Sequence, residues 1–228
     1  MAPTNQPLNP NECRMLGKCG WVATQLMADD ADAFEQAVLS LGQFLGTPIT
    51  TRTRRLVDRL TPKLADKAHP HSLSRMSGTG QQPWHMDMSH RVEPARYLVM
   101  GMHECRPVRT ADTELLDAST LVPTDLHEEA LSEPFLIRTG AQSFYATIKA
   151  KGAPFVRFDP GCMHGTTARA KALMQQLLNR TLAPAHVHQW TPGAVLVIDN
   201  WKMLHRRADA TASINRTLYR VSVMGGAT

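Results

Sequence analysis

Residues 190–225 read WTPGAVLVIDNWKMLHRRADATASINRTLYRVSVMG and hold the clearest strand pattern in the chain. AVLVID (194–199) is an uninterrupted apolar run, which is typical of a strand buried on both faces. NRTLYRVSV (215–223) follows as a second strand, and NWKML (200–204) is predicted to be a turn region that leads to His205. This stretch predicts a β-rich core.

The rest of the chain shows the same pattern in shorter pieces. Two segments have helical spacing, 29–45 after an acidic start and 166–180. We therefore expect one domain over residues 1–228, a sandwich or closed barrel with a few helices outside the sheet, and a loose lead-in over 1–15. The other runs interpreted as strands are RYLVMGMHE (96–104), PFLIRTG (134–140), SFYATIKA (143–150) and APFVRFDP (153–160).

Composition narrows the class of protein. The 228 residues are 43% hydrophobic and 20% charged, values that are ordinary for a globular domain. No apolar run has the length of a membrane span, and the N-terminus lacks a signal pattern, so a cytoplasmic protein is expected. The cysteines form no CxxC pair, which argues against a zinc ribbon or a disulfide framework: Cys13, Cys19, Cys105 and Cys162.

The formal net charge is +5, and much of the basic excess lies in residues 51–75. A nucleic-acid arm is usually denser in basic residues and interleaved with aromatics, whereas only 6% of this chain is aromatic. We interpret the stretch as a solvated basic face. Attraction of small anionic substrates is the second interpretation, and nucleic-acid binding is the third.

The segment GTGQQPWHMDMSHRVEPARYLVM (78–100) contains a candidate half-site for a metal. His85 and Asp87 are two residues apart, so on a strand both side chains point to the same face and can reach one ion. An HxD pair alone is a weak signal because such pairs are common by chance. His205 supplies a second imidazole, and two His with one carboxylate form the set that leaves one face of iron open in non-haem oxygenases.

Two arginines after His205 strengthen this hypothesis. Residues 216, 218 and 220 share one face of the predicted strand, so Arg216 and Arg220 are presented together. A guanidinium that faces the interior needs an anion, and a dicarboxylate co-substrate can supply one. The alternative, two solvent-facing arginines on an edge strand, loses weight when the HxD…H pattern precedes them.

The sequence resembles the taurine dioxygenase/clavaminate synthase-like superfamily of Fe(II)/2-oxoglutarate-dependent dioxygenases. The resemblance covers roughly residues 70–225 and implies a mainly β fold, a double-stranded β-helix (jelly roll) with a few flanking α-helices. The pieces that carry it occur in the family's order: WHMD (84–87), ADTELLDA (111–118), VRFDPGCM (156–163), PGAVLVIDNWKMLHRR (192–207) and NRTLYRV (215–221).

The resemblance also implies the cofactors and their residues. His85, Asp87 and His205 match the family's Fe(II) ligands, and 2-oxoglutarate and O₂ are the implied co-substrates. Thr113 matches the threonine that hydrogen-bonds 2-oxoglutarate, and Arg216 matches the arginine that pairs with its distal carboxylate. Arg220 matches a second arginine that reaches the co-substrate or a substrate anion. Asp87 favours oxygenation, because related halogenases have a small residue at that position.

The sequence leaves the substrate open. Arg75, in the strand-like SLSRMSG, and Arg157 and Asp159 are candidates that could grip an amino acid or another small polar acid, and surface salt bridges are the alternative. Trp84 and Trp201 flank the ligands and are expected to pack the site walls.

Two other functions compete with the oxygenase. A cupin-like metal-binding or isomerase protein would share the barrel but lack the trailing arginines, and a nucleic-acid-binding protein would use the basic stretch. The HVH pair (186–188) has no carboxylate partner and is assigned to packing. A homo-oligomer is neither predicted nor excluded.

Overall fold

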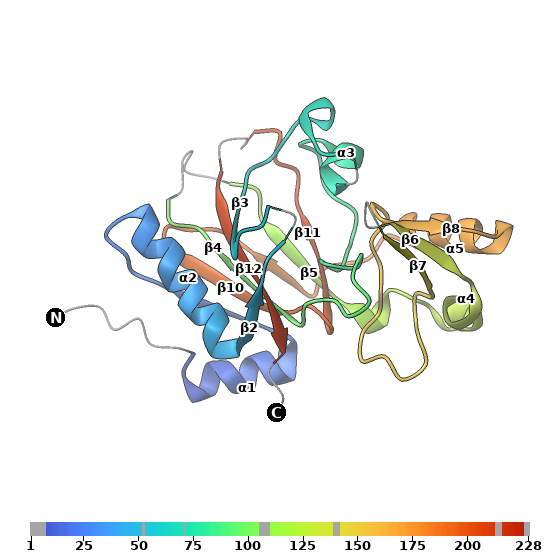
Figure 1. The fold of residues 1–228 in the computed structure, drawn as a ribbon, viewed down its shortest axis with the longest axis horizontal. Coiled ribbons are helices and arrows are strands. Elements are labelled where there is room, and N and C mark those ends of the chain that lie inside the picture. The colour runs from blue at the N-terminus through green and yellow to red at the C-terminus, as the bar shows by residue number, and fades with distance from the viewer. Residues whose placement is uncertain are drawn as a thin grey trace.

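The computed structural model describes residues 8–51, 53–70, 72–104, 110–138, 142–212 and 216–225. The largest sheet is antiparallel and has the strand order β1-β10-β4-β12-β2, with β3 also paired to β12 (Figure 1). Its central strand β4 lies between the two strands that the C-terminal stretch predicted. The bounds are β1 (Trp21–Gln25), β2 (Gly46–Ile49), β3 (Val57–Leu60), β4 (Tyr97–Gly101), β10 (Ala194–Asp199) and β12 (Leu218–Gly225).

A second antiparallel sheet, ordered β11-β5-β9, covers one face of the first. It consists of β5 (Thr113–Asp117), β9 (His186–His188) and β11 (Met203–Arg207). Leu196 and Ile198 of β10 pack with Leu115 of β5 and Met203 of β11 in the core between the sheets. The mainly β fold predicted from the sequence is confirmed, and the face-to-face sheets are consistent with a jelly roll.

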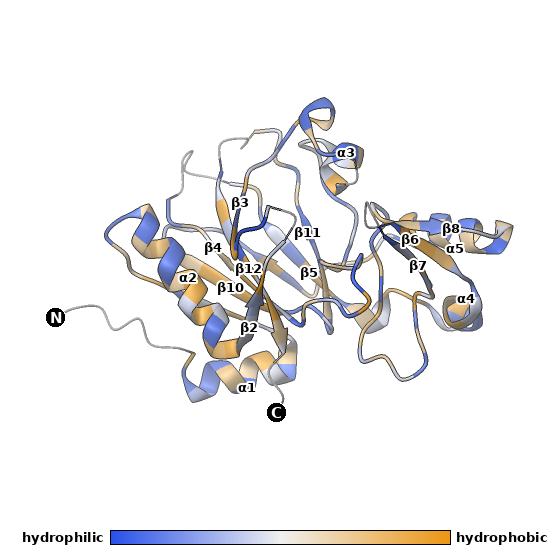
Figure 2. Cartoon of the chain, viewed as in Figure 1, coloured by the Kyte–Doolittle hydropathy of each residue, from blue (hydrophilic) through white to orange (hydrophobic). Residues whose placement is uncertain are grey.

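The other face of the large sheet is covered by helix α2 (Ala31–Leu45). Val195 and Val197 of β10 pack on this side, with Phe34 and Val38 of the helix. The two faces of β10 therefore enter two different cores, which explains why AVLVID carries no polar alternation. In Figure 2, β10 is coloured hydrophobic, whereas α2 alternates between apolar and polar bands.

A smaller lobe is inserted in the sequence between β5 and β9 of the second sheet. It contains the antiparallel sheet β7-β6-β8 and the helices α4 (His127–Ser132) and α5 (Ala168–Leu178), and it lies at the side of the molecule away from α2 (Figure 1). Its own core joins the main body through Trp84, Met86 and Leu204. The strands are β6 (Phe135–Arg138), β7 (Ser143–Ala146) and β8 (Met163–Gly165).

Both predicted helices are confirmed, and each begins two residues later than predicted. Asp30 caps α2 by accepting from the backbone N–H of Asp32 and Ala33, and Thr167 caps α5 by accepting from Ala170 N–H. Such caps satisfy backbone donors that the first helical turn leaves unpaired. The buried faces have helical spacing, with Phe34, Ala37, Val38 and Leu41 in α2 and Ala170, Leu173 and Leu177 in α5. Phe44, which was predicted to lie on the apolar face of α2, is exposed.

The lead-in predicted over residues 1–15 is wrong from Pro10 onward, where helix α1 (Pro10–Cys19) begins. Asn9 and Glu12 form a reciprocal capping box, and Gly20 ends the helix in the left-handed conformation at φ 78°. Only Leu16 of this helix is buried, so it lacks the apolar stripe by which helices are found in sequences. Residues 1–7 lie outside the described part of the chain.

The strand predictions are confirmed at β4, β6, β7, β10 and β12, and several others need correction. APFVRFDP (153–160) forms no strand and contributes one bridge, Lys149 with Val156. SLSRMSG forms the short helix α3 (Leu73–Ser77) instead of a strand, because its alternation spans too few residues to distinguish the two. The strand β11 begins inside the predicted turn, and Thr113 begins β5. The single-turn 3₁₀ helices are Ala65–Lys67, Ala118–Thr120 and Thr124–Leu126.

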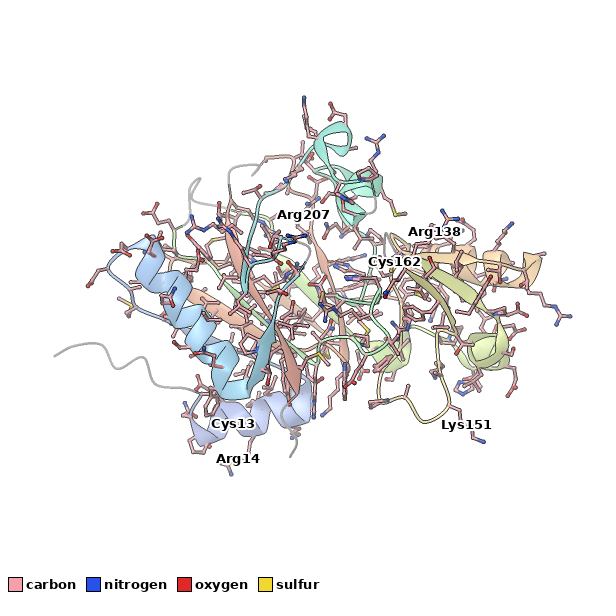
Figure 3. The ribbon with its side chains drawn as sticks, viewed as in Figure 1. Cys13, Arg14, Arg138, Lys151, Cys162 and Arg207 are labelled. Carbon is pink, nitrogen blue, oxygen red and sulfur yellow. The ribbon has the colours of Figure 1, made fainter. Side chains whose placement is uncertain are left out.

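The cysteines of the described residues, Cys13, Cys19 and Cys162, are free thiols, as the absence of a CxxC pattern indicated. Figure 3 shows Cys13 at the outside of α1 and Cys162 at the smaller lobe. Cys105 lies outside the described residues. Among the described residues, no helix is long and apolar enough to cross a membrane.

Candidate metal centre

A cavity of about 540 Å³ opens beside the second sheet, and its wall brings together residues from distant parts of the chain. The predicted metal ligands His85, Asp87 and His205 all line it. So do the residues predicted to bind 2-oxoglutarate, Thr113, Arg216 and Arg220, together with Asp159. One cavity therefore contains every residue that the family resemblance selected.

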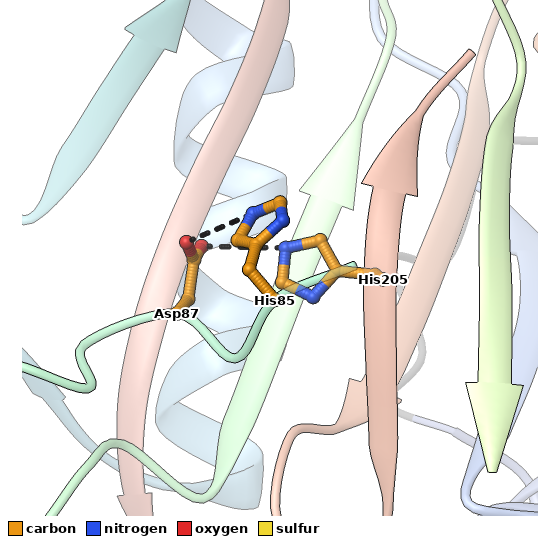
Figure 4. A group of neighbouring side chains, drawn as sticks. All are labelled: His85, Asp87 and His205. Carbon is orange, nitrogen blue, oxygen red and sulfur yellow. Dashed lines mark ion pairs between the residues drawn. The ribbon is translucent and has the colours of Figure 1, made fainter. Parts of the chain in front are cut away.

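The ligand atoms of His85, Asp87 and His205 lie within 4.8 Å of one another. Nε2 of His85 is 3.7 Å from Oδ1 of Asp87, and Nε2 of His205 is 3.7 Å from Oδ2 (Figure 4). Two imidazole nitrogens and a carboxylate at these distances fit a divalent metal ion with an open face. Among the described residues this is the group of metal-ligand side chains that meets in one place.

His85 and Asp87 converge by a different route from the one predicted. They do not share a strand: His85 forms an isolated backbone bridge with His205, and a turn follows at Asp87. The bridge consists of His85 N–H to His205 O at 3.1 Å and His205 N–H to His85 O at 2.9 Å. The two histidines are therefore held side by side by main-chain hydrogen bonds, and the turn brings the carboxylate to them.

The hydrogen bonding of His85 selects the nitrogen that faces the site. Nδ1 lies 3.1 Å from the Pro83 carbonyl oxygen, which can only accept, so Nδ1 carries the proton and Nε2 keeps its lone pair. Burial, with the neighbouring His85, lowers the pKa of His205 to about 3. The His205 ring is thus neutral over the physiological range, the form that binds metals.

The carboxylate of Asp87 is ionised although it is buried. Burial alone favours the neutral acid, but the positive charge of Arg220 and the two imidazoles outweigh it and hold the pKa of Asp87 well below its ordinary value. Nη1 of Arg220 donates to Oδ2 of Asp87 at 2.5 Å. The same guanidinium donates from Nη2 to Oδ2 of Asp58 at 2.8 Å.

The main chain of Asp87 is also fixed, by the fully buried Asn200. Asn200 Oδ1 accepts from Asp87 N–H at 3.1 Å, and its Nδ2 donates to Asp87 O at 3.0 Å and to Ala95 O at 2.8 Å. Asn200 directly follows β10, so the most buried strand of the fold positions the turn that carries the carboxylate. The sequence interpretation missed this role, because it treated residues 200–204 only as a turn.

Thr113 and Arg216 both line the cavity, and Arg216 lies two residues before the start of β12. Thr113 begins β5, and its Oγ1 accepts a hydrogen bond from Trp190 Nε1 at 3.1 Å. Arg216 is only 5% exposed and donates to the Ala111 carbonyl, and burial lowers the pKa of Arg216 to about 10. Arg216, Leu218 and Arg220 all line the cavity, as the predicted alternation required, although β12 itself begins at Leu218.

The three residues predicted to contact the substrate lie in different surroundings in the structure. Arg75 is exposed on α3, donates to the Ala65 carbonyl and does not line the cavity. Arg157 is buried, and its donors bind the carbonyls of Ser89, Arg91 and Val92, so it shapes a loop. Asp159 is the one that lines the cavity, and burial raises the pKa of its carboxyl.

Trp84 and Trp201 were predicted to pack the site walls, but neither side chain lines the cavity. The guanidinium of Arg206 stacks over the Trp84 ring at 4.0 Å from its centroid, and Trp201 Nε1 donates to Pro94 O at 3.1 Å. Arg207, labelled in Figure 3, is buried and donates to Gly78 O and Gly80 O, each at 2.7 Å. It thereby fixes the segment that leads to His85.

Comparisons with known proteins show which proteins this chain is similar to. A family model described as "Taurine catabolism dioxygenase TauD, TfdA family" matches residues 126–222, the part that holds His205, Arg216 and Arg220. A comparison with curated protein sequences gives no significant match.

Solved structures of similar fold agree with this match. An asparagine oxygenase in complex with Fe(II), 2S,3S-3-hydroxyasparagine and succinate has a TM-score of 0.75 and 16% identity over 94% of this chain and 78% of its own. A taurine dioxygenase from Burkholderia xenovorans has a TM-score of 0.67 and is 16% identical in sequence. The match covers 97% of this chain and 84% of the taurine dioxygenase. A variant of the non-heme iron oxygenase OrfP in complex with (3S)-hydroxy-L-Arg has a TM-score of 0.66 and is 17% identical in sequence. The match covers 95% of this chain and 78% of OrfP.

These findings confirm the resemblance to the taurine dioxygenase/clavaminate synthase-like superfamily. The proteins to which the chain is similar in sequence pattern and in fold are Fe(II)/2-oxoglutarate-dependent dioxygenases. The cofactors predicted from the sequence, Fe(II), 2-oxoglutarate and O₂, are those of this class.

Proposed function

We propose that His85, Asp87 and His205 hold Fe(II), and that the enzyme oxidises an unactivated C–H bond of a small polar metabolite, an amino acid or another small acid. The observation that carries the proposal is the convergence of the three ligand atoms within 4.8 Å. They lie in the wall of the cavity that also contains Arg216 and Thr113. When bound, Fe(II) with 2-oxoglutarate and O₂ supplies the oxidising power, with release of succinate and CO₂.

The donor set suits the metal. Two imidazoles and one carboxylate form the 2-His-1-carboxylate set, which leaves a face of the ion for a co-substrate and O₂. Pro83 O orients His85, and Arg220 with Asn200 orients Asp87, so the ligands are held before metal binds. A cupin-like site would draw on more histidines and would not need Arg216.

Arg216 and Thr113 are proposed to hold 2-oxoglutarate. A guanidinium this buried is costly unless it meets an anion, and the distal carboxylate of a dicarboxylate is a matching partner. Thr113 Oγ1 accepts from Trp190, whose indole can only donate, so the Thr113 proton remains for a carboxylate acceptor in the cavity. The two residues would thus grip the co-substrate from two sides.

Asp159 is proposed to bind the ammonium group of an amino-acid substrate. It lines the same cavity as the ligands, and its Oδ1 accepts from Gly161 N–H at 2.8 Å, which fixes the direction of the carboxylate. A cationic amine beside this buried carboxyl offsets the burial that raises its pKa. Two of the neighbouring structures hold hydroxylated asparagine and arginine, which supports an amino-acid substrate.

Anaerobic addition of Fe(II) and 2-oxoglutarate tests the metal and co-substrate sites. We expect a weak visible charge-transfer band in the parent enzyme and its loss in Asp87→Ala and Arg216→Ala. Arg75→Ala, an arginine exposed outside the cavity, is the matched control and should keep the band. Absence of the band in the parent, with zinc tightly retained instead, would reject the oxygenase in favour of a cupin-like protein.

Succinate release under air across a panel of amino acids and other small acids tests the substrate. The true substrate should stimulate release, and Asp159→Asn should raise its KM while leaving anaerobic 2-oxoglutarate binding unchanged. Equal stimulation of parent and Asp159→Asn by the same amino acid would remove Asp159 from the proposal.

A further inference from the structure

Asp58 is a buried carboxylate outside the predicted site, in the stretch interpreted from sequence as a solvated basic face. Its side chain is 3% exposed, and in the β3–β12 register it stands opposite Arg220. A buried carboxylate is costly unless paired and hydrogen-bonded. Thr51 and Thr53 each donate a hydroxyl to Oδ1 at 2.6 Å, while Oδ2 accepts from Arg220.

These partners make Asp58 a fixed anchor. Burial acts to raise its pKa, but Arg220 and the two hydroxyls outweigh it and lower the pKa, so the carboxylate stays charged. Both of its oxygens are held, one by the hydroxyls and one by the guanidinium. The side chain therefore has little freedom to rotate.

Arg220 connects Asp58 to Asp87, because its guanidinium donates to both carboxylates. Its guanidinium is planar, so fixing Nη2 on Asp58 also fixes the direction of Nη1, which donates to Oδ2 of Asp87 at 2.5 Å. A lysine in this place would be a point charge and could not bridge both carboxylates in a defined geometry.

This contact decides how many oxygens Asp87 can offer a metal. Each oxygen lies 3.7 Å from an imidazole Nε2, Oδ1 from that of His85 and Oδ2 from that of His205. The two oxygens differ because Oδ2 accepts the hydrogen bond from Arg220. A metal ion held by only three protein donor atoms would keep positions open for a co-substrate and O₂. A carboxylate bound through both oxygens would occupy one of these, so restricting Asp87 to one oxygen preserves the open face.

We propose that Asp58 is a positioning residue that acts through Arg220 to confine Asp87 to a single metal-binding oxygen, Oδ1. This assigns a role to the Thr51–Thr53–Asp58 segment, and it places Arg220 as the clamp of the metal ligand. The inference rests on the proposed function, because it takes Asp87 as the carboxylate ligand.

Metal titration of the folded protein tests the inference without turnover. Co(II) is titrated anaerobically into parent and Asp58→Asn, and its visible spectrum reports both affinity and coordination number. Partners that orient metal ligands are typically worth about 10–100-fold in metal affinity. We expect Asp58→Asn to raise the Co(II) Kd by about that factor and to change the intensity of the visible bands.

A double-mutant cycle separates positioning from a general structural role. Arg220→Lys should resemble Asp58→Asn, and Asp58→Asn in the Arg220→Lys background should add little, because the two residues act as one unit. Thr53→Val removes one hydroxyl and should raise the Kd a few-fold, whereas Thr53→Ser keeps the hydroxyl and should match the parent. Thr53→Val also carries the test if Asp58→Asn fails to fold.

The outcomes distinguish the inference from the function on which it rests. If the parent binds no Co(II) through His85, Asp87 and His205, the proposed metal site itself is wrong. If the parent binds Co(II), and folded Asp58→Asn or Thr53→Val has its Kd within about two-fold and an unchanged spectrum, the positioning role is overturned. Additive effects in the double-mutant cycle would also overturn it.

Discussion

The side-chain amide of Asn200 forms two hydrogen bonds with the main chain of Asp87, accepting from its N–H at 3.1 Å and donating to its C=O at 3.0 Å. The amide thus acts as a strand neighbour would, for a residue that lies in a turn. A third hydrogen bond, to Ala95 O at 2.8 Å, fixes the amide in turn. The carboxylate proposed to bind metal is therefore attached to the rigid end of β10.

Asn200→Ala should weaken metal binding as well as the fold. It leaves the Asp87 N–H and two carbonyls without their partner, which costs about 1–3 kcal/mol for each buried group left unsatisfied. We expect a lower thermal midpoint without metal and a Co(II) Kd raised by about 10–100-fold in the protein that remains folded. Asn179→Ala, at the exposed end of α5, is the matched control and should leave the Kd unchanged. An unchanged Kd in Asn200→Ala would restrict Asn200 to a folding role.

Trp190→Phe should weaken 2-oxoglutarate binding without affecting the metal. The indole N–H donates to Thr113 Oγ1 at 3.1 Å, and phenylalanine keeps an aromatic ring but removes this donor. Thr113 is then free to turn its proton away from the cavity. A hydrogen bond is worth about 1 kcal/mol, so the 2-oxoglutarate Kd should rise about five-fold. Anaerobic titration of the charge-transfer band measures it, and an unchanged Kd would show that Trp190 does not orient the hydroxyl.

The strands and the ligand types were predictable because they depend on local pattern. The AVLVI part of AVLVID is apolar because the two faces of this strand enter different cores. The metal ligands could be proposed from the sequence because histidine and aspartate are themselves metal-binding residue types. The helices α2 and α5 have wide apolar stripes and clear caps. Helix α1 lacks the stripe, with Leu16 as its buried residue, and so it was not predicted.

The direction of a long side chain was not predictable. Arg157 and Asp159 are two residues apart in VRFDP, yet Asp159 lines the cavity while Arg157 donates to three carbonyls of a loop more than 60 positions earlier in the sequence. The direction of the Asp58 side chain was likewise not predictable from the sequence. It lies among seven basic residues in the stretch that was interpreted as a solvated basic face, and the pairing of β3 with β12 brings it to Arg220.

Gly101→Ala should destabilise the fold, because α2 crosses β4 closely at this residue. An added Cβ would lie 2.9 Å from Phe34 Cε1 and 2.9 Å from Val38 Cγ2, inside the core under the helix. Overpacking of this kind costs about 1–3 kcal/mol in the free energy of unfolding. Gly17→Ala is the matched control, since an added Cβ there meets nothing within 4 Å in an exposed helical position. It should stabilise α1 by about 0.5–1 kcal/mol in urea unfolding. Equal effects of the two variants would contradict this packing.

The metal-free protein should lose stability as the pH falls from about 6.5 to about 4, in part through His188. Burial, with His186 beside it, lowers the pKa of His188 from 6.5 to about 4, and its Nε2 has no hydrogen-bond partner among the described residues. Below about pH 6.5 the unfolded chain binds a proton that the folded chain does not, so the free energy of unfolding falls with pH. The loss is complete below the folded pKa and is on the order of 3 kcal/mol.

His188→Phe should flatten this pH dependence while preserving the fold. The phenyl ring keeps an aromatic group against Trp190, whose ring meets His188 edge-on at 4.4 Å, and it removes the buried unpaired nitrogen. Both proteins keep His205, whose pKa burial lowers to about 3, so the difference between their curves isolates residue 188. Urea unfolding of both metal-free proteins at a series of pH values between 4 and 7.5 gives the comparison. Parallel curves would show that the pKa of His188 is the same in the folded and unfolded states, and would remove His188 from the acid sensitivity of the fold.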